Sequence, residues 1–380
     1  MRIGLDVRYL SHGLTGGVRT YVYHLARELP RCASSHEFIF YADEKAPFEL
    51  KERAPNVLVR ILPWRSALSS VRNDVMLGRW MNRDGVHVAH CPGNYGPKTE
   101  APLVVTLHDT INLFPLSEHL RGFGRRARQV ALMVYLGRMT RSTLRRASHV
   151  ITVSEHARRD IAARGGIPLD RITAIHEAAS EEFRRIDDRK LLDAVRSRFG
   201  LPERFVLADG IKNPAALIGA FRRLPDRLRA TTDLVFFSRE RSPRPAVAEA
   251  LPRGGVKFLS RPLTPHLVAL MNLARVFAFP SWYEGFGIPL VEAMRCGTPI
   301  IASSRGSIPE IVGDAGLIFD LESPERIVAH LRSVLEDDGL CQSLGERALR
   351  RSERFSWQRT ARQTLEVYER VAVSRRRRTA

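Results

Sequence analysis

Two glutamates, Glu284 and Glu292, are the residues with the clearest chemical potential in this chain. A carboxylate can accept two hydrogen bonds from a vicinal diol, so the pair is suited to grip hydroxyls at two places on one extended ligand. The plainer alternative is that Glu292 stabilises a helix start electrostatically and Glu284 is a solvated loop residue. The closely spaced glycines and prolines around the pair favour ligand binding.

The segment that carries these glutamates predicts a strand, a glycine loop and a helix. The strand ends at Pro280, the loop contains Gly285, Phe286 and Gly287, and the helix begins near Ile288. A helix start presents backbone N–H groups without partners inside the helix. Anions bind well there, and phosphate is the usual occupant. We therefore expect a phosphate-facing helix start between two carboxylates.

Other candidates follow predicted strands of the first half. His108 and its neighbour Asp109 come at the carboxyl end of a strand, where open α/β sheets carry their ligands. Asn94 lies on another loop of this kind. Gly16 and Gly17 precede a helix, where the backbone can approach a ligand closely. Taken alone these signals are weak, because a lone histidine is more often structural and paired glycines are common in turns.

In the second half, Lys212 and Asn213 follow a predicted strand. Asp209 stands just upstream, and Arg239 comes after the next strand as a second candidate cation. Most lysines and arginines on protein surfaces have no catalytic role, so position in the fold must decide whether these bind phosphate.

Short apolar runs alternate with helical stretches along the chain. We predict strands at Arg2–Val7, Phe38–Tyr41, Val57–Ile61, Val86–His90, Leu103–Leu107, Val150–Val153, Ile172–Ile175, Phe205–Ala208, Leu234–Phe237, Val256–Phe258, Val276–Phe279, Pro299–Ala302 and Leu317–Phe319. This alternation is typical of α/β proteins with parallel sheets covered by helices. So many strands suit two doubly wound Rossmann-like halves better than one sheet. We predict domains at residues 1–185 and 186–356, and a C-terminal helix with a basic tail at 357–380 that packs back toward the first domain.

Composition is that of a soluble globular protein, with 44% hydrophobic and 27% charged residues. The sequence contains no apolar run of the roughly 20 residues that span a bilayer, and its start does not resemble a signal peptide. The 4 cysteines are scattered without a Cys-x-x-Cys pair, which argues against a zinc site and fits a reducing cytoplasm.

The net charge of +19 comes mostly from arginine. It favours anionic partners such as phosphates, acidic lipids or nucleic acid, although genomic bias toward arginine codons is the plainer explanation. The segment Arg121–Arg146 combines many arginines with apolar residues. It fits either a helix with a solvated basic face or a segment that lies on an anionic membrane surface.

The Glu284–Glu292 segment resembles the family 4 retaining glycosyltransferases, whose hallmark is two glutamates separated by seven residues. The segment Gly306–Gly316 also looks like the pattern of this family, so the likeness covers most of the second half. The resemblance implies the GT-B fold, in which two Rossmann-like domains face each other across a cleft. It also implies a nucleotide-sugar donor as substrate, no further cofactor and no metal.

The roles of single residues are carried over from this resemblance. It implies that Glu284 binds the transferred sugar and supports positive charge at the reacting carbon, and that Glu292 binds the ribose. His108 would contact the sugar, and Gly16 and Gly17 the diphosphate and the acceptor. Lys212 matches a diphosphate-binding lysine, but Asp209 stands where family members usually carry an arginine. Asn94 and Asp109 are assigned to the acceptor side.

Overall similarity to bacterial mannosyltransferases of surface polysaccharide and lipopolysaccharide assembly favours GDP-mannose as the donor. UDP-glucose and UDP-GlcNAc are the alternatives, and a glycan or lipid-linked glycan is the expected acceptor. Lipid-linked acceptors favour a peripheral position on the inner face of the cytoplasmic membrane. Another GT-B enzyme remains open, as does, more distantly, a basic nucleic-acid-binding protein, although no nucleic-acid-binding motif appears.

Overall fold

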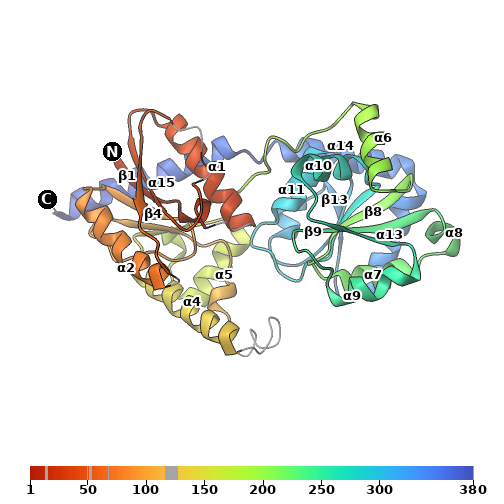
Figure 1. Cartoon of the computed structure of the whole chain (residues 1–380), viewed down its shortest axis with the longest axis horizontal. Coiled ribbons are helices and arrows are strands. Elements are labelled where there is room, and N and C mark those ends of the chain that lie inside the picture. The colour runs from red at the N-terminus through yellow and green to blue at the C-terminus, as the bar shows by residue number, and fades with distance from the viewer. Residues whose placement is uncertain (13–15, 49, 51–53, 67, 116–126, 380) are drawn as a thin grey trace. The chain divides into compact units, whose positions relative to one another are not determined.

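The computed structural model describes residues 1–12, 16–48, 50, 54–66, 68–115 and 127–379. The chain forms two compact units, one made of Met1–Glu177 with Trp357–Ala380 and the other of Ala178–Ser356. The division falls before the predicted boundary at residues 185–186, and the C-terminal helix is counted with the first unit. Figure 1 shows the course of the chain through both units.

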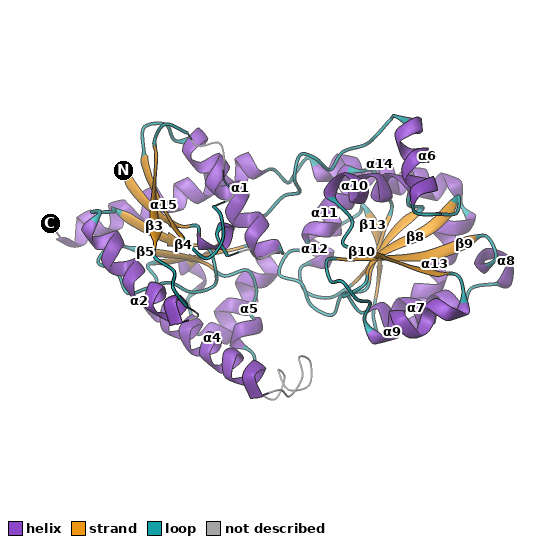
Figure 2. Cartoon of the chain, viewed as in Figure 1, coloured by secondary structure: helices purple, strands orange, loops and turns teal. Residues whose placement is uncertain are grey.

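The first unit is built on a parallel sheet of 7 strands in the order β3-β2-β1-β4-β5-β6-β7. Its strands are β1 (Arg2–Asp6), β2 (Glu37–Asp43), β3 (Val57–Leu62), β4 (Val88–Cys91), β5 (Leu103–Thr106), β6 (His149–Thr152) and β7 (Ile172–Ala174). Its helices are α1 (Gly17–Cys32), α2 (Leu68–Arg83), α4 (Ala127–Arg146), α5 (Glu155–Gly165) and α15 (Trp357–Thr379). Helices α1 and α15 lie together on one face of the sheet, and α2, α4 and α5 lie on the other (Figure 2).

Helix α15 is joined to the first unit by buried polar and aromatic contacts. The Tyr368 hydroxyl lies 2.5 Å from Nδ1 of His90 on β4. Thr360 donates a hydrogen bond to the carbonyl of His176. The rings of Trp357 and His24 stack at a centroid distance of 4.6 Å. Since these side chains are buried, the last helix is part of the core of the first unit.

The second unit carries a parallel sheet of 6 strands in the order β10-β9-β8-β11-β12-β13. Its strands are β8 (Arg204–Asp209), β9 (Thr232–Ser238), β10 (Val256–Ser260), β11 (Val276–Phe279), β12 (Ile300–Ser303) and β13 (Gly316–Phe319). Its helices are α6 (Arg189–Arg198), α7 (Pro214–Arg222), α8 (Asp226–Arg229), α9 (Pro245–Ala250), α10 (Thr264–Leu273), α11 (Ile288–Arg295), α12 (Ile308–Val312), α13 (Pro324–Glu336) and α14 (Asp338–Ser352).

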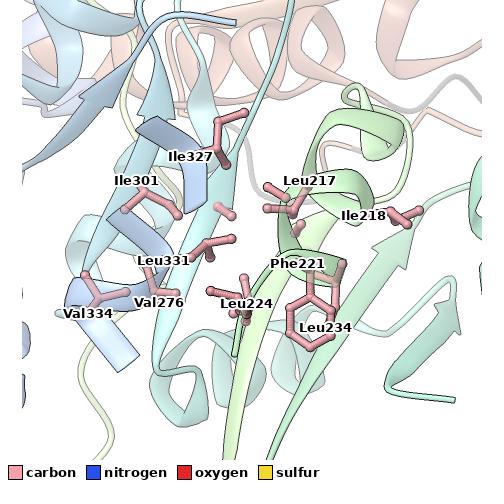
Figure 3. Packing of buried hydrophobic residues seen from close by; sticks show 14 of the residues in the cluster. Leu217, Ile218, Phe221, Leu224, Leu234, Val276, Ile301, Ile327, Leu331 and Val334 are labelled. Atoms are coloured by element: carbon pink, nitrogen blue, oxygen red, sulfur yellow. The ribbon is translucent and has the colours of Figure 1, made fainter. Parts of the chain in front are cut away.

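One hydrophobic core cluster of the second unit lies between a face of its sheet and the helices α7 and α13. Figure 3 shows Leu217 and Phe221 of α7 beside Leu331 of α13, packed over Val276 and Ile301 of the sheet. Burial on both faces explains why these strands read as continuous apolar runs. In the described part of the chain, all thirteen predicted strands form, with ends that differ by at most about two residues. The prediction of two doubly wound parallel sheets is confirmed.

Candidate functional site

In the second unit, the candidate residues gather at the carboxyl ends of β8, β9, β11 and β12. The chain order of the sheet reverses between β8 and β11, which are hydrogen-bonded neighbours. Ligands of open α/β sheets bind outside the carboxyl ends of the strands at such a reversal. Lys212 follows β8, and Glu284 follows β11, so the topology brings them to the same point.

The side chains of Glu284 and Lys212 meet directly. Lys212 Nζ lies 2.6 Å from Glu284 Oε1, and the same oxygen accepts a hydrogen bond of 2.6 Å from the Ser281 hydroxyl. The Glu284 side chain is 13% exposed and that of Lys212 is 30% exposed, so a ligand can reach both. This contact holds the carboxylate in one orientation before any ligand arrives.

A second loop, which follows β12, fixes the backbone around Glu284. The Ser307 backbone N–H and hydroxyl both donate to the carbonyl of Glu284, each at 3.1 Å, and the hydroxyl also donates to the carbonyl of Phe286. Ser303 donates to the carbonyl of Ser281 at 2.6 Å. Sequence reasoning missed both serines, because their partners are carbonyl groups that carry no sequence signal.

Gly306 makes this loop contact possible. It adopts a positive φ of 61°, and a Cβ atom there would come within 2.5 Å of the Glu284 carbonyl oxygen. Any larger side chain would have to displace the backbone of Glu284. The close approach of the Glu284 backbone thus explains the glycine that begins the predicted Gly306–Gly316 pattern.

Helix α11 begins as predicted, immediately after the glycine loop. Gly287 precedes it with a φ of 98°, a conformation that glycine adopts without strain. The ring of Phe286, next to Gly285, packs edge to face against Phe355 at 5.7 Å and is buried. Helix α11 ends at Arg295, before Gly297 with its φ of 71°. Helix α11 is therefore flanked on both sides by a glycine with a positive φ.

Glu292 lies one turn inside α11 and is buried, with 5% exposure. Burial raises the pKa of its carboxyl group to about 7, because the charged form loses hydration. The charge of Arg239 lowers this pKa, and that of Asp209 raises it. Glu292 thus shares a small electrostatic cluster with the two residues that flank the predicted phosphate site.

The turn that carries Lys212 and Asn213 is held by Asp209. The Asp209 carboxylate accepts from the backbone N–H of Ile211 at 3.0 Å, and its carbonyl accepts from the backbone N–H of Lys212. Burial raises the pKa of Asp209, while Lys212 and the exposed Arg239 lower it. The carboxylate therefore shapes the turn, and Arg239 is near enough to supply a second positive charge.

Asn213 adds an open hydrogen-bond donor beside Lys212. It adopts a left-handed conformation with a φ of 52° at the start of α7. Its Nδ2 atom is buried and has no hydrogen-bond partner within the described residues. Because an unsatisfied buried amide costs free energy, this donor favours an acceptor from outside the unit.

In the first unit, His108 follows β5 and is buried, with 8% exposure. Its Nδ1 lies 3.2 Å from Oε1 of Glu177, and its Nε2 lies 2.9 Å from the carbonyl oxygen of Pro92. Burial alone would lower the pKa of His108, but the hydrogen bond and charge of Glu177 outweigh it and raise the pKa. Both nitrogens face acceptors, as in a protonated imidazole.

The remaining candidates of the first unit were predicted at Asp109, on the separate loop of Asn94, and at Gly16 and Gly17 before a helix. Asn94, with a φ of 70°, accepts the backbone N–H of His108 at 3.0 Å. Asp109 accepts the backbone N–H of Ile111 at 2.9 Å, so its carboxylate shapes the following turn. Gly16 has a φ of 126°, and Gly17 is the first residue of α1. No atom of the described residues lies within 4 Å of the position that a Cβ atom on Gly16 would occupy. Asn94 and His108 are therefore linked, while Asp109 has a local structural contact.

A buried charge network at the end of β1 was not predicted. Arg8 donates to Asp6 at 2.8 Å and to Asp74 of α2 at 2.7 Å, and all three side chains are buried. Tyr95 and Tyr135 each donate to Asp74 at 3.3 Å. The strand-end rule that singled out His108 also applies to Asp6 and to Glu177, and it could have identified both.

The segment Arg121–Arg146 is only partly described, because residues 121–126 lie outside the described residues and α4 begins at Ala127.

Within the described residues, no group of three or more His, Cys, Asp or Glu side chains is arranged to hold a metal ion. None of the helices in the described ranges has both the length and the hydropathy to span a bilayer.

Comparisons with known proteins match both halves of the chain. A model of Glycosyltransferase Family 4 matches residues 15–182, and a model of glycosyl transferases group 1 matches residues 208–351. The chain is 29% identical over 300 residues to O-antigen chain mannosyltransferase B of Escherichia coli, covering 76% of each protein. It is 32% identical over 240 residues to the serotype-specific mannosyltransferase WbdA of Escherichia coli, covering 60% of this chain but only 29% of that protein.

Among solved structures, sucrose-phosphate synthase from Thermosynechococcus elongatus is similar with a TM-score of 0.72. The likeness covers 98% of this chain and 99% of that one at 18% sequence identity, and at this level it shows a shared fold. The candidate residues of each unit thus lie within the span of a matching family model.

Proposed function

The chain belongs to the family 4 glycosyltransferases of the GT-B fold, and we propose that it transfers a hexosyl unit, with retention, from a nucleoside diphosphate sugar. The acceptor is a hydroxyl of a glycan or lipid-linked glycan in bacterial surface polysaccharide assembly. The observation that carries the proposal is the contact of Glu284 with Lys212 at the sheet reversal, beside the buried Glu292.

The proposed reaction needs charge stabilisation at two places. As the bond between the anomeric carbon and the phosphate oxygen breaks, positive charge grows on the sugar and negative charge on the diphosphate. Glu284 supports the first, and Lys212 supports the second, because preorganised charges act most strongly in a site closed to water. The acceptor oxygen bonds to the anomeric carbon from the face that the diphosphate leaves, and a phosphate oxygen takes its proton.

The two remaining second-unit residues fit the nucleotide. We assign the Asn213 amide to a phosphate oxygen, because its Nδ2 is buried and has no partner within the described residues. We assign Glu292 to the ribose hydroxyls. With a pKa of about 7, its carboxyl group ionises readily when hydroxyl donors arrive to satisfy it.

We place His108 on the side of the transferred sugar. Its Nε2 is engaged by Pro92, so it reaches a sugar hydroxyl when that hydrogen bond exchanges. The contact with Glu177 orients the ring meanwhile and raises its pKa. Gly16 and Gly17 are assigned to the diphosphate, and Asn94 and Asp109 to the acceptor side.

The donor we propose is GDP-mannose, because the relatives named above are mannosyltransferases. UDP-glucose is the second candidate. A ligand that binds only the folded state raises the melting temperature, so GDP should raise it more than UDP or ADP at equal concentration. The matching transfer assay should consume GDP-mannose and release GDP. A larger shift with UDP would indicate a UDP-sugar as the donor in place of GDP-mannose. No shift with any nucleotide would contradict the proposed function.

We further propose that the outer faces of α2 and α4 contact an anionic membrane surface. Val71 and Val75 of α2 and Leu132 of α4 are 51%, 61% and 55% exposed. The two helices lie side by side, because Tyr135 of α4 donates to Asp74 of α2 (Figure 1). Exposed arginines such as Arg79 and Arg138 share these helices. Apolar side chains beside arginines suit the interface of acidic lipids.

Vesicle sedimentation tests this contact. Leu132→Asp places a negative charge on the exposed face and should lower binding to phosphatidylglycerol vesicles by a factor of about ten or more. The matched control is Leu263→Asp, which changes a leucine that is 66% exposed in the second unit. Equal binding of both variants and the parent would exclude this face as the contact.

A further inference from the structure

A basic pocket lies in the first unit at the amino ends of β5 and β6. It has a volume of about 770 Å³, and Leu103 and His149, the first residues of these strands, contribute to its wall. His108, by contrast, follows the carboxyl end of β5. The pocket is therefore at the opposite edge of the sheet from the residues assigned to sugar transfer. Its basic side chains are Lys98, Arg145, Arg146, Arg171 and Arg370.

These cations come from separate parts of the chain. Lys98 lies on the loop before β5, Arg145 and Arg146 end α4, and Arg171 precedes β7. Arg370 is supplied by α15, the helix that returns to this unit after the second one. Two acidic residues, Glu100 and Asp170, also line the pocket. Five cations against two carboxylates leave a clear excess of positive charge.

Neutral groups hold three of the guanidinium groups in place. Arg370 donates to the Thr173 hydroxyl at 3.0 Å and contacts Nε2 of His149 at 3.3 Å. Arg171 donates to the carbonyl of Ala147. Arg146 donates to the carbonyl of Gly96 and to the Ser142 hydroxyl. Because none of these acceptors is charged, the arginines are positioned without being neutralised.

His149 behaves as an acceptor in this setting. Burial, together with the charges of Arg370 and Arg171, lowers its pKa to about 4. The ring is therefore neutral at physiological pH, and its Nε2 lies 2.8 Å from the Thr173 hydroxyl oxygen and 3.3 Å from the Arg370 guanidinium group. The imidazole orients Arg370 and adds no positive charge of its own.

We propose that this basic pocket binds a phosphate-bearing ligand, a phosphomonoester or diphosphate group, at a site separate from the donor site. Fixed guanidinium groups match phosphate geometry and form paired hydrogen bonds with its oxygens. A ligand with two or three negative charges balances the excess of cations. A solvated basic patch explains an isolated arginine, but five cations and only two carboxylates around one concave pocket leave a net repulsion that a bound anion relieves.

Hydrogen exchange with inorganic pyrophosphate as the probe tests the pocket directly. Pyrophosphate, compared with sodium chloride at equal ionic strength, should slow exchange in peptides that cover residues 97–103, 145–149 and 370–374. Arg370→Gln and Arg145→Gln should each raise the pyrophosphate concentration needed for protection at least about tenfold. Arg145 is exposed, so its removal leaves the fold intact even if Arg370→Gln weakens it.

The matched control is Arg362→Gln, an exposed arginine on the same helix that does not line the pocket. It should bind pyrophosphate as the parent does. Sedimentation with vesicles that contain phosphatidic acid, whose headgroup is a phosphomonoester, separates the sources of phosphate. If Arg370→Gln also lowers vesicle binding, the ligand is a lipid headgroup, and if vesicle binding is unchanged, the ligand is soluble. Equal protection in the parent, Arg370→Gln and Arg145→Gln would overturn the proposal.

Discussion

Glu284→Gln is expected to lower kcat for sugar transfer by a factor of about 10² to 10³, the usual cost of removing one preorganised electrostatic partner of a transition state. Glutamine keeps the size of the side chain and a carbonyl oxygen for Ser281, but it removes the negative charge. Nucleotide affinity should change by less than about threefold, because Lys212 keeps its positive charge for the diphosphate.

The control for this variant is Glu249→Gln, an exposed glutamate of α9 in the same unit. It should transfer sugar at the rate of the parent. Rates from a single-turnover assay under saturating donor separate the chemical step from binding. A kcat for Glu284→Gln equal to that of the control would show that Glu284 takes no part in the reaction.

Glu292→Gln is expected to stabilise the ligand-free protein and to weaken nucleotide binding. The pKa of Glu292 is raised from 4.5 to about 7, so the folded state holds a proton that the unfolded state has lost between these values. Stability therefore falls as pH rises through this window, and the cost is complete above about pH 7. A shift of this size corresponds to about 3 kcal/mol, of which we expect glutamine to recover about 1–3 kcal/mol at pH 8.

Urea unfolding at two pH values measures this effect. The gain of Glu292→Gln over the parent should be present at pH 8 and small near pH 4.5, where Glu292 is protonated in the folded protein. Nucleotide affinity should fall at least about tenfold, because glutamine replaces the acceptor for the ribose hydroxyls. A variant that is less stable than the parent at pH 8 would show instead that the carboxylate supports the fold.

The fold was predictable because its signal is local. Each strand of β4 to β6 is a short run of residues buried on both faces, and such runs are recognised without knowledge of their neighbours. The start of α11 was likewise predicted from Pro289 and the glycines before it. These features depend on residues that are adjacent in sequence, so one sequence is enough to find them.

The contacts between the site residues could not be predicted from the sequence in the same way. Glu284 meets Lys212 and Gly306 only because β8, β11 and β12 are neighbours in the sheet. His108 meets Glu177 across 69 positions of sequence. Composition and periodicity do not specify strand order, and therefore they identify candidate residues without their partners. The raised pKa of the buried Glu292 is similarly a property of the packed unit.

The contribution of α15 to the first unit has a consequence for synthesis of the chain. Tyr368 and Trp357 fill positions in the core of a unit whose other residues end at Glu177. A ribosome releases these side chains only after the whole of Ala178–Ser356 has emerged. The second unit can therefore complete its core as soon as its own residues have been made, whereas the first, although begun earlier, must wait for α15.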